Sequence, residues 1–547
     1  MSLLDDVSIV VTPNGYKAGE LYAVIPVPTE GAEQVVNGDF ATDSDWVKGT
    51  GWTISGDTAN CNNTSGSTQD LKTENRILNL GGKRVQISFT VSNYSGSASM
   101  IVTLQGTGGN DFTGINANGT YTTLSLIAPT DNSIDLLFKA SNGWVGSIDN
   151  VSVKEYTSAD MDVTRSTAAT RVDENGLIED VLSNVPRIDY TGGGCPHILA
   201  EPQRTNLITY SEDFSDSSWS KNDVSETSGF TSPDGTDNAY KVLEDTTTST
   251  HFIKATNVFT ADGTDRAQTI YVKPIGRRYI AISSGTDFTN NNNTLIFDTQ
   301  LGDWGLNSSS NNLGLNSSVD ENGWWRLVFK SDATSGAYDN FSIGTAIADL
   351  SYADANFTGD SSKGFYIWGA QVEAGSYATS YIPTSGSTVT RNQDIFTRDG
   401  IGSLINSTEG VLFVEAAALS NDGTNRFLFV SDGTNDNGVR FYYSTTNNQI
   451  ILRYYVGGAA TAIISFTLPN ALNFNKIAFK WKVNDFALWV DGVEVGTDSS
   501  GAVLSANTLN SVSLTTGVGA SPFFSKVKQL QVYKTALTDD TLALLTS

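Results

Sequence analysis

The stretch from Val35 to Ser55, "VVNGDFATDSDWVKGTGWTIS", indicates the fold because a similar stretch returns later in the chain. Residues 207–226 read "LITYSEDFSDSSWSKNDVSE", and both stretches place Asp-Phe ahead of polar residues and a Trp. A repeated opening of this kind is typical of a module that occurs twice. We expect Phe40 and Phe214 to fill the cores of the two copies, and Trp46 and Trp219 to close over the core edges.

Each opening has a matching closing segment with the alternation of a half-buried strand. The first is "GSIDNVSVKEY" at residues 146–156 and the second is "GFYIWGAQVEAGSYATSYIP" at residues 364–383. Between opening and closing lie short strand-like runs separated by Gly, Asn, Asp and Ser. First and last strands side by side, with antiparallel strands between them, make a jelly roll. We therefore predict jelly rolls at 33–156 and 206–384.

The remainder of the chain predicts a third antiparallel sandwich at 385–547. Its strongest signals are two hairpins, "GVRFYYSTTNNQIILRYYVGG" and "NKIAFKWKVNDFALWVDGVEVG", and a short final helix that begins after Thr538. Residues 1–32 predict a strand pair around "TPNG" that serves as a docking segment. Residues 157–205 show little periodicity, and we expect an irregular segment that packs against neighbouring domains or another subunit. The fold class is all-β, with tandem antiparallel β-sandwiches.

Composition and charge exclude several functions. The 547 residues are 39% hydrophobic and carry a formal net charge of −26, so a polyanion such as nucleic acid is an unfavourable partner. No run approaches the roughly 18 apolar residues of a membrane span, which argues against membrane insertion. The N-terminus lacks the basic and apolar regions of a signal peptide. The acidic balance does permit Ca²⁺, which prefers carboxylate and carbonyl oxygens.

The sequence shows no catalytic motif. The chain has two His and two Cys, and neither type has the spacing of a metal site or a nucleophilic constellation. Glycoside hydrolysis by paired carboxylates remains as the enzymatic alternative, that is, a polysaccharide depolymerase. The closely spaced acids that mark such enzymes on one strand are not reproduced. We therefore expect a protein that is not an enzyme.

Aromatic residues supply the candidate carbohydrate-binding side chains, which are Trp144, Tyr442 and Tyr454. Trp144 lies in a strand-like run, where packing in the core is the more usual role. The tyrosines belong to the adjacent pairs 442–443 and 454–455. Because neighbours in a strand face opposite sides, one tyrosine of each pair must leave the core side. An outward tyrosine of this kind can line a ligand-binding or subunit surface.

Several long stretches of the chain resemble virion structural proteins of tailed bacteriophages, of the tail-fibre and head-fibre type. Examples are "RSTAATRVDENGLIEDVLSNVPRIDY" and "FYIWGAQVEAGSYATSYIPTSGSTVTRNQD", and the resemblance covers residues 1–32 and about 160–394. It implies a homotrimer on the particle exterior, assembled in the host cytoplasm. Its partners would be other virion proteins and a host cell-surface glycan. A purely structural capsid or tail decoration protein is the alternative.

Two modules carry further resemblances. Residues 33–156 resemble a carbohydrate-binding module of the jelly-roll type. Residues 400–547 are similar to the concanavalin/laminin-G-like fold through "FALWVDGVEVG" and "LQVYKTALTDDTLALL". Carbohydrate-binding jelly rolls commonly hold a structural Ca²⁺ between first and last strands, and the resemblance places Asp39 and Asp149 at that metal site. The alternative is that both are turn aspartates that accept backbone hydrogen bonds.

Overall fold

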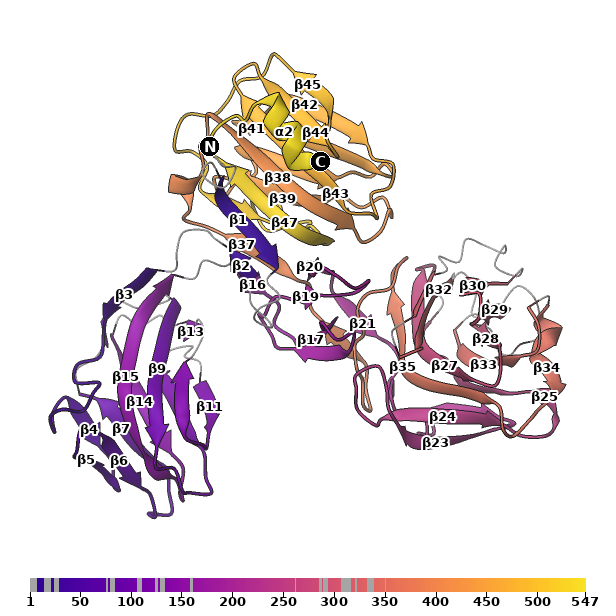
Figure 1. Ribbon diagram of the computed structural model, residues 1–547, viewed down its shortest axis with the longest axis horizontal. Coiled ribbons are helices and arrows are strands. Elements are labelled where there is room, and N and C mark those ends of the chain that lie inside the picture. The colour runs from indigo at the N-terminus through magenta and orange to yellow at the C-terminus, as the bar shows by residue number, and fades with distance from the viewer. Residues whose placement is uncertain are drawn as a thin grey trace. The chain divides into compact units, whose positions relative to one another are not determined.

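The computed structural model is almost entirely β-structure, as the sequence predicts (Figure 1). It describes residues 7–13, 21–23, 29–74, 77–78, 84–105, 111–122, 126–127, 133–157, 161–260, 262–284, 288, 294–305, 316–319, 322–331, 339–349 and 351–547. The chain divides into two compact units, residues 26–159 and residues 1–25 with 160–547. No helix in the described part of the chain is long and apolar enough to cross a membrane.

The unit at 26–159 is a sandwich of two antiparallel sheets. The first sheet contains β11 (Asp111–Ile115), β10 (Met100–Gln105), β14 (Ser133–Ala140), β7 (Gln69–Thr73), β4 (Trp46–Lys48) and β8 (Ile77–Leu78). The second contains β12 (Gly119–Thr122), β9 (Arg84–Ser92), β15 (Val145–Thr157), β6 (Ala59–Asn62), β5 (Trp52–Ile54), β13 (Leu126–Ile127) and β3 (Thr29–Glu33). β3 pairs with the last strand β15, so the module opens and closes on neighbouring strands.

The second sandwich has the same plan, with two six-stranded sheets. One contains β22 (Trp219–Asn222), β26 (Phe252–Ala255), β33 (Phe341–Ala346), β28 (Tyr279–Ser283), β29 (Thr294–Asp298) and β30 (Asp303–Trp304). The other contains β23 (Val224–Phe230), β24 (Ala239–Glu244), β35 (Gly364–Ala374), β27 (Arg266–Ile275), β32 (Trp325–Ser331) and β31 (Asn316–Val319). A small edge pair is formed by β25 (Thr248–Thr250) and β34 (Asn356–Thr358), beside the 3-10 turn η2 (Tyr352–Ala355).

The repeated Asp-Phe…Trp opening is a structural repeat as well. In the first module Phe40 and Trp46 are buried with ring centroids 5.1 Å apart, and in the second Phe214 and Trp219 are buried at 4.8 Å. Each indole N–H donates to the carbonyl nine residues earlier, at 3.0 Å and 2.8 Å respectively. The Trp therefore ties the opening loop to the core edge in both copies.

The opening loop also bonds to the closing strand in each module. The Gly38 carbonyl accepts from the Val151 N–H at 2.8 Å, and the Ser211 carbonyl accepts from the Ala370 N–H at 2.9 Å. A side chain at Gly38 would place its Cβ 2.0 Å from the Val151 carbonyl oxygen. Glycine is required there because the backbones approach so closely.

The C-terminal sandwich takes strands from three distant parts of the chain. Its larger sheet contains β19 (Ile188–Asp189), β20 (His197–Ala200), β47 (Ser525–Tyr533), β38 (Glu409–Ala418), β43 (Asn475–Lys482), β44 (Phe486–Val490), β45 (Val493–Asp498), β1 (Val7–Pro13) and β2 (Leu21–Ala23). Its seven-stranded sheet contains β16 (Asp162–Thr164), β37 (Ile395–Arg398), β46 (Ser511–Ser513), β39 (Arg426–Ser431), β40 (Gly438–Tyr443), β41 (Gln449–Val456) and β42 (Ala459–Thr467). The expected pair of N-terminal strands forms, and β1 adds to the edge of β47; the "NG" of its turn lies outside the described residues.

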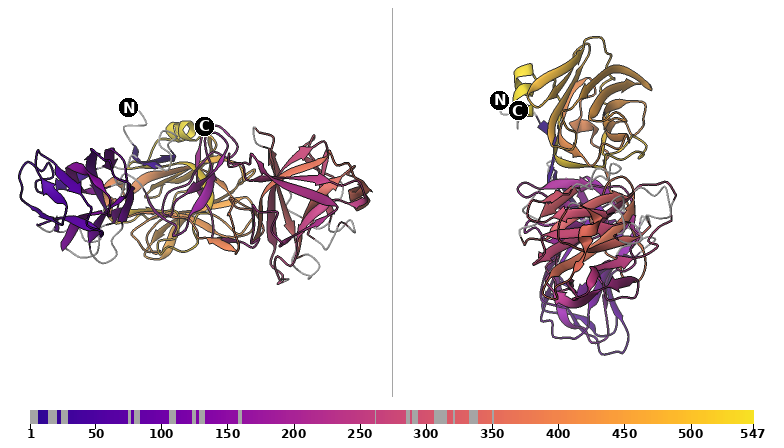
Figure 2. Two further views of the ribbon diagram at one scale, coloured as in Figure 1. Left: turned by 90° about the horizontal axis from the view of Figure 1, so that it is seen from below. Right: turned by 90° about the vertical axis from the view of Figure 1, so that its right-hand side faces the viewer.

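The short helix α2 (Asp539–Thr546) begins where the sequence predicts it. The Thr538 hydroxyl accepts a hydrogen bond from the Thr541 N–H, and two acids occupy the first turn. The helix lies against the outer face of β43 and β44, and Leu542 is buried there beside Trp489 (Figures 1 and 2). The helix therefore covers apolar residues on the outer face of the larger sheet, not on the seven-stranded sheet.

The segment at 157–205 is not irregular throughout. It contributes β16, β19 and β20 to the C-terminal sandwich and forms a hairpin of β17 (Ala169–Val172) and β18 (Ile178–Val181). The next strand, β21 (Arg204–Asn206), pairs with β36 (Val389–Arg391). The 3-10 turn η3 (Gly402–Leu404) lies further along the chain. Strands of two to four residues are too short to show alternation in a sequence, which is why the expectation of irregular structure was wrong.

A buried cluster of charged side chains joins this segment to residues 380–394. Arg165, Arg187 and Arg391 meet Glu201 and Asp394, and all five are at most 4% exposed. Arg187 bonds to both acids, Arg165 Nη1 lies 2.7 Å from Asp394 Oδ1, and Arg391 Nη1 lies 2.8 Å from Glu201 Oε2. Although burial opposes it, the two arginines beside Glu201 hold the pKa of that carboxyl well below its usual range.

His197 in β20 predicts an acid-sensitive step in stability. Burial lowers the pKa of His197 from 6.5 to about 4, although Asp189 Oδ1 lies 3.4 Å from its Nε2. Above pH 6.5 the neutral form contributes fully, and as pH falls toward 4 the unfolded chain binds the proton first. We expect up to about 3 kcal/mol of unfolding free energy to be lost across that window.

Urea denaturation at several pH values between 7 and 4.5 measures this effect, with His197→Asn as the comparison. The variant should have a flatter dependence of unfolding free energy on pH between 6.5 and 4.5, because the side chain at position 197 no longer titrates there. Parallel curves for the two proteins would show that His197 does not titrate on unfolding in this range.

Candidate functional site

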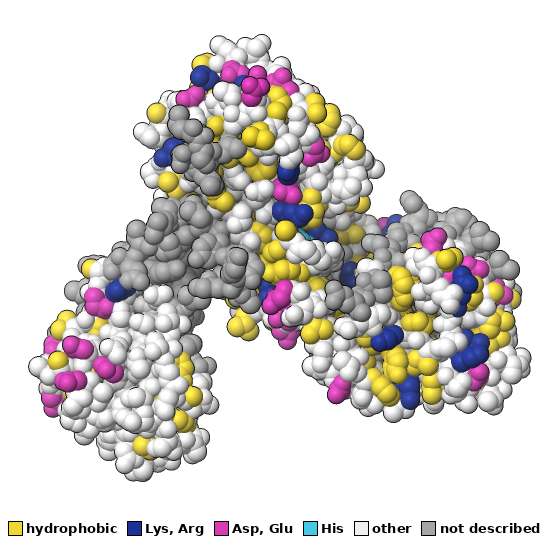
Figure 3. Space-filling model, viewed as in Figure 1, with side chains coloured by type: hydrophobic (Ala, Val, Ile, Leu, Met, Phe, Trp, Pro, Cys, Tyr) yellow, Lys and Arg dark blue, Asp and Glu magenta, His cyan; other side chains and the backbone are white. Residues whose placement is uncertain are grey.

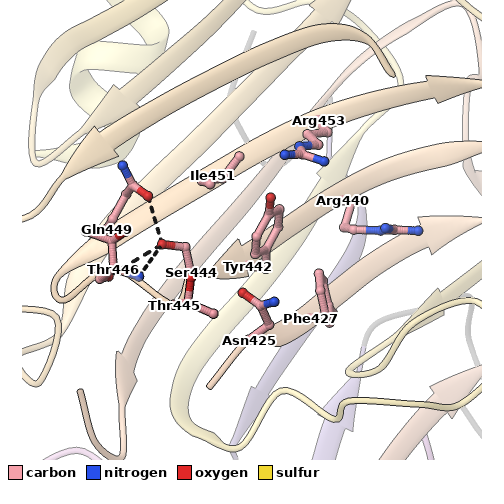
Figure 4. A pocket seen from close by; sticks show the side chains of 10 residues that line it. All are labelled: Asn425, Phe427, Arg440, Tyr442, Ser444, Thr445, Thr446, Gln449, Ile451 and Arg453. Atoms are coloured by element: carbon pink, nitrogen blue, oxygen red, sulfur yellow. Dashed lines mark hydrogen bonds between the residues drawn. The ribbon is translucent and has the colours of Figure 1, made fainter. Parts of the chain in front are cut away.

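The candidate site is a groove on the outer face of the seven-stranded sheet of the C-terminal sandwich (Figure 4). Leu428, Val439 and Leu452 on β39, β40 and β41 point into the core, so by alternation their neighbours point outward. The groove has a volume of about 360 Å³ and is lined by Asn425, Phe427, Arg440, Tyr442, Ser444, Thr445, Thr446, Gln449, Ile451 and Arg453.

The floor of the groove is apolar and aromatic. Phe427 and Tyr442 are cross-strand partners with ring centroids 4.8 Å apart, and Ile451 is the partner of Tyr442 on the other side. Tyr442 is only 6% exposed, whereas Phe427 and Ile451 are half-buried and retain free surface. Such a floor offers an apolar platform of the kind that ligand sites use for contact area.

The rim at one end of the groove is polar and neutral. The β40–β41 turn supplies Ser444, Thr445, Thr446 and Gln449, and Figure 4 shows them gathered opposite the arginines. The Ser444 hydroxyl donates to Gln449 Oε1 at 2.8 Å and accepts from the Thr446 N–H at 3.0 Å, which holds the turn in place. Hydroxyl and amide groups arranged in this way can donate to and accept from a polar ligand.

The other end of the groove carries two arginines. Arg440 on β40 and Arg453 on β41 are direct cross-strand partners. The Arg440 guanidinium lies over the rings of Phe429 and Tyr455 at 4.6 Å and 4.5 Å, and Arg453 lies 5.6 Å from the Tyr442 ring centroid. Burial lowers the pKa of Arg440, while a hydrogen bond to Tyr455 raises the pKa of Arg453; both stay charged.

No carboxylate in the described part of the chain lies within ion-pair distance of Arg440 or Arg453. Both guanidiniums instead share the hydroxyl of Tyr455, which lies 3.5 Å from Arg440 Nη1 and 3.2 Å from Arg453 Nη1. The Nε of each arginine is buried without a hydrogen-bond partner in the described structure. Two like charges therefore face each other across a strand pair with a neutral group between them.

The second sandwich shows the usual arrangement of cations. Figure 3 shows Lys and Arg side chains interspersed with hydrophobic ones over this domain. Arg277, Arg278 and Lys330 lie 2.6 Å, 2.5 Å and 3.0 Å from Glu244, Asp298 and Asp265, respectively. Arg440 and Arg453 have no such partner in the described part of the chain, and neither do Arg326 and Arg398. Unlike those two, Arg440 and Arg453 are direct cross-strand partners of each other.

A second groove, of about 350 Å³, lies on the second sandwich and includes Tyr210, Glu212, Asp213 and Tyr240. Its acids are already engaged, since Glu212 accepts hydrogen bonds from Tyr381 and Asn238. Burial raises the pKa of Glu212. Asp213 likewise accepts hydrogen bonds from the Ser215 and Tyr240 hydroxyls, so both acids of this groove are bonded within the protein.

The tyrosine pairs behave as strand alternation requires, but only one of the two chosen residues faces outward. Tyr442 lines the groove, while Tyr443 points into the core. In the other pair Tyr454 is fully buried and its hydroxyl donates to the Ser407 carbonyl, while Tyr455 lies on the outer face. The assignment of Tyr454 as a sugar-binding residue is therefore corrected, because its inward side is occupied by core contacts.

Trp144 is likewise a core residue. It is 0% exposed, its indole N–H donates to the Ile115 carbonyl at 3.1 Å, and its ring stacks on Trp52 at 6.0 Å. A side chain without exposed surface cannot contact a sugar, so its assignment as a carbohydrate-binding residue is corrected too.

Asp39 and Asp149 both accept hydrogen bonds from nearby backbone. Asp39 is exposed and accepts from the Ala41 N–H at 3.4 Å, and Asp149 accepts from the Asn150 N–H at 2.6 Å. Within the described residues no three His, Cys, Asp or Glu side chains gather in a way that could hold a metal ion. The two aspartates do not by themselves make a fitting Ca²⁺ site, and calcium binding stays a prediction.

Sequence reasoning missed Arg440 and Arg453. A signal was present, because each arginine stands two residues before an outward tyrosine, in "RFY" and "RYY". Residues two apart on a strand share a face, so the outward tyrosines bring their arginines to the same surface.

A match to a protein family identifies the type of fold of the C-terminal sandwich. Residues 414–543 match the family model described as the concanavalin A-like lectin/glucanases superfamily, with the name Laminin_G_3. The C-terminal sandwich is thus concanavalin-like, as the sequence predicts. No curated protein sequence matches the chain.

Three solved structures illustrate the structural matches. The CBM40 module of the Ruminococcus gnavus IT-sialidase, bound to α2,3-sialyllactose, is 19% identical and covers 28% of this chain and 92% of its own, with a TM-score of 0.23. Domain 4 of AbnA, a GH43 arabinanase from Geobacillus stearothermophilus, is 13% identical and covers 28% of this chain and 73% of its own, with a TM-score of 0.24. The receptor-binding domain of a botulinum neurotoxin mosaic is 8% identical and covers 28% of this chain and 39% of its own, with a TM-score of 0.23. At TM-scores this low the matches carry no argument about ligands.

Proposed function

We propose that this protein is a virion component of a tailed bacteriophage, of the fibre type, and that it attaches the particle to a glycan on the host surface. The groove of the C-terminal sandwich would be the glycan site. The observation that carries the proposal is the groove itself, where the half-buried surfaces of Phe427 and Ile451 lie beside a neutral polar rim. Sugars present both an apolar face and hydroxyl groups, and this lining complements both.

The phage origin rests on the resemblance of residues 1–32 and about 160–394 to virion proteins. The family match at 414–543, described by its lectin and glucanase members, supports a carbohydrate ligand for the C-terminal sandwich. A homotrimer held to other virion proteins would present several copies of each groove on the particle exterior. Many weak contacts then add up to strong attachment, because linked sites bind with high effective concentration.

We assign binding rather than hydrolysis to this groove. Glycosidases generally work with two carboxylates that flank the scissile bond. None of the described residues that line the groove is Asp or Glu. A depolymerase would need acids that reach the floor of the groove, and its strands present Phe427, Tyr442 and Ile451 there instead.

Replacing Phe427 with alanine tests the glycan site. The variant removes apolar platform and leaves the polar rim, so we expect the affinity for glycans recognised on an array to fall about tenfold, or about 1.4 kcal/mol. Val493→Ala is the matched control, because Val493 is 60% exposed on the opposite sheet of the same domain. Equal binding by both variants would place the glycan site elsewhere.

Imaging of intact virions tests the display of the protein. We expect projecting trimers whose C-terminal sandwiches are surrounded by solvent. Burial of those sandwiches against capsid or tail subunits would favour a purely structural decoration protein.

A further inference from the structure

The Arg440–Arg453 pair combines two features. The two arginines are direct cross-strand partners, and neither has a carboxylate within ion-pair distance in the described part of the chain. Like charges directly opposite each other on an antiparallel pair destabilise the sheet. Natural proteins break such local rules mainly at functional sites. Most other described arginines lie within 4 Å of a carboxylate, among them Arg165, Arg171, Arg277 and Arg426.

The pair also lies in the least acidic part of the chain. Residues 395–547 contain 10 Lys and Arg and 12 Asp and Glu, a net charge of −2, whereas the whole chain carries −26. A ligand with a negative charge is therefore not repelled by the domain as it would be by the rest of the protein. In the β39–β40 loop, Asp432 is engaged, since it accepts hydrogen bonds from the Thr434 and Asn437 side chains, and Asp436 is exposed.

The geometry at Tyr455 leaves the two positive charges uncompensated. One neutral hydroxyl lies within reach of both guanidiniums, at a place where a carboxylate would satisfy both. The Arg453 guanidinium lies beside the Tyr442 hydroxyl at the edge of the groove, and Arg440 extends past Phe427 (Figure 4). Arginine binds carboxylates through two parallel N–H donors, which a planar carboxylate on a sugar ring can engage.

We propose that this groove recognises an acidic saccharide, whose carboxylate binds at Arg453 with Arg440 as the second positive charge. The sugar ring would then lie over Phe427 and Ile451, with its hydroxyls toward Gln449 and Thr446. This inference rests on the proposed glycan-binding function and names the chemical class of the ligand. We specify a carboxylate on a sugar because the groove places apolar and hydroxyl-bearing side chains, which suit a sugar ring, next to the two arginines.

Calorimetric titration of the full chain tests the proposal, with an oligogalacturonate and the same oligosaccharide after reduction of its carboxyl groups. The charged form should bind at least tenfold more tightly than the reduced form. Arg453→Gln should weaken binding of the charged form about 10- to 100-fold, since hydrogen bonds between charged groups are the strong ones. Arg440→Gln should weaken it less, because Arg440 is largely packed between rings.

Arg398→Gln is the matched control. It removes the same charge from the same sheet at another strand, β37, and should leave the affinity unchanged. Circular dichroism and melting temperature of each variant confirm that it is folded. An equal loss in Arg398→Gln would mean that net charge alone drives the binding, which overturns the proposal.

The remaining outcomes separate this inference from the proposed function. If neutral glycans bind and Phe427→Ala abolishes their binding, while oligogalacturonate does not bind, the glycan site stands and the acidic ligand fails. If no glycan of either kind binds, both fail. Tighter binding of dextran sulfate than of oligogalacturonate overturns the choice of a carboxylate. Self-association that Arg453→Gln disrupts would make this face a contact between copies of the chain.

Discussion

Asp394→Asn should lower the free energy of unfolding of the unit at 160–547 by about 3–5 kcal/mol. The Asp394 carboxylate is fully buried, accepts from Arg165 at 2.7 Å, also contacts Arg187, and accepts the Glu201 N–H at 2.9 Å. Asparagine keeps the shape but removes the negative charge. The cluster would then hold three buried arginines against one acid, and a buried charge without compensation is strongly destabilising.

Denaturant titration of the full chain measures this effect, and hydrogen exchange shows which strands are affected. We expect exchange to increase in β16, β20 and β36, which carry or flank the cluster. Glu409→Gln is the control, because it breaks an ion pair whose partners, Lys482 and Glu409, are 50% and 30% exposed. Such a pair contributes about 1 kcal/mol or less. A loss in Asp394→Asn no larger than in this control would contradict a structural role for the cluster.

Trp144→Ala should destabilise the unit at 26–159 by about 3–5 kcal/mol. The indole lies in the core between the two sheets, stacked on Trp52 and 5.9 Å from the Tyr94 ring. Its removal leaves a large cavity and an unpaired Ile115 carbonyl. Because the side chain is fully buried, any loss of ligand binding should follow unfolding and not precede it.

Scanning calorimetry of the full chain should show one transition shifted to lower temperature, with the other unit unaffected. Val47→Ala, at a side chain that is 45% exposed on β4, serves as the control and should change stability by less than about 0.5 kcal/mol. If Trp144→Ala left stability unchanged but removed glycan binding, the assignment of this tryptophan to the core would be wrong.

Much of the local structure could be predicted because its causes are local. The Asp-Phe…Trp repeat identified two modules, since the same loop and indole hydrogen bond recur with the same nine-residue spacing. Two hairpins of the C-terminal sandwich and the start of α2 at Thr538 followed from turn and capping residues. The all-β class followed from short alternating runs.

Only part of the candidate site could be predicted from the sequence, and the reason is physical. A period of two puts adjacent tyrosines on opposite sides of a strand, but it does not say which side is the core. Tyr442 and Tyr455 face outward because their strands pack Val439 and Leu452 inward. The register of β40 against β41 then decides that Arg440 meets Arg453. In a hairpin that register is set by the type and length of the turn, which strand alternation alone does not specify.

The sequence by itself determined the repeated modules, their short strands and the caps and turns that bound them, because these depend on residues close together in the chain. Only the tertiary structure decided that β1 joins β47 across more than 500 residues and that Arg165, Arg187, Glu201 and Asp394 share one buried cluster. It also decided which tyrosines are buried and which arginines lack partners. The joining of β1 to β47 and the buried charged cluster depend on contacts between distant segments, which local periodicity and composition do not specify.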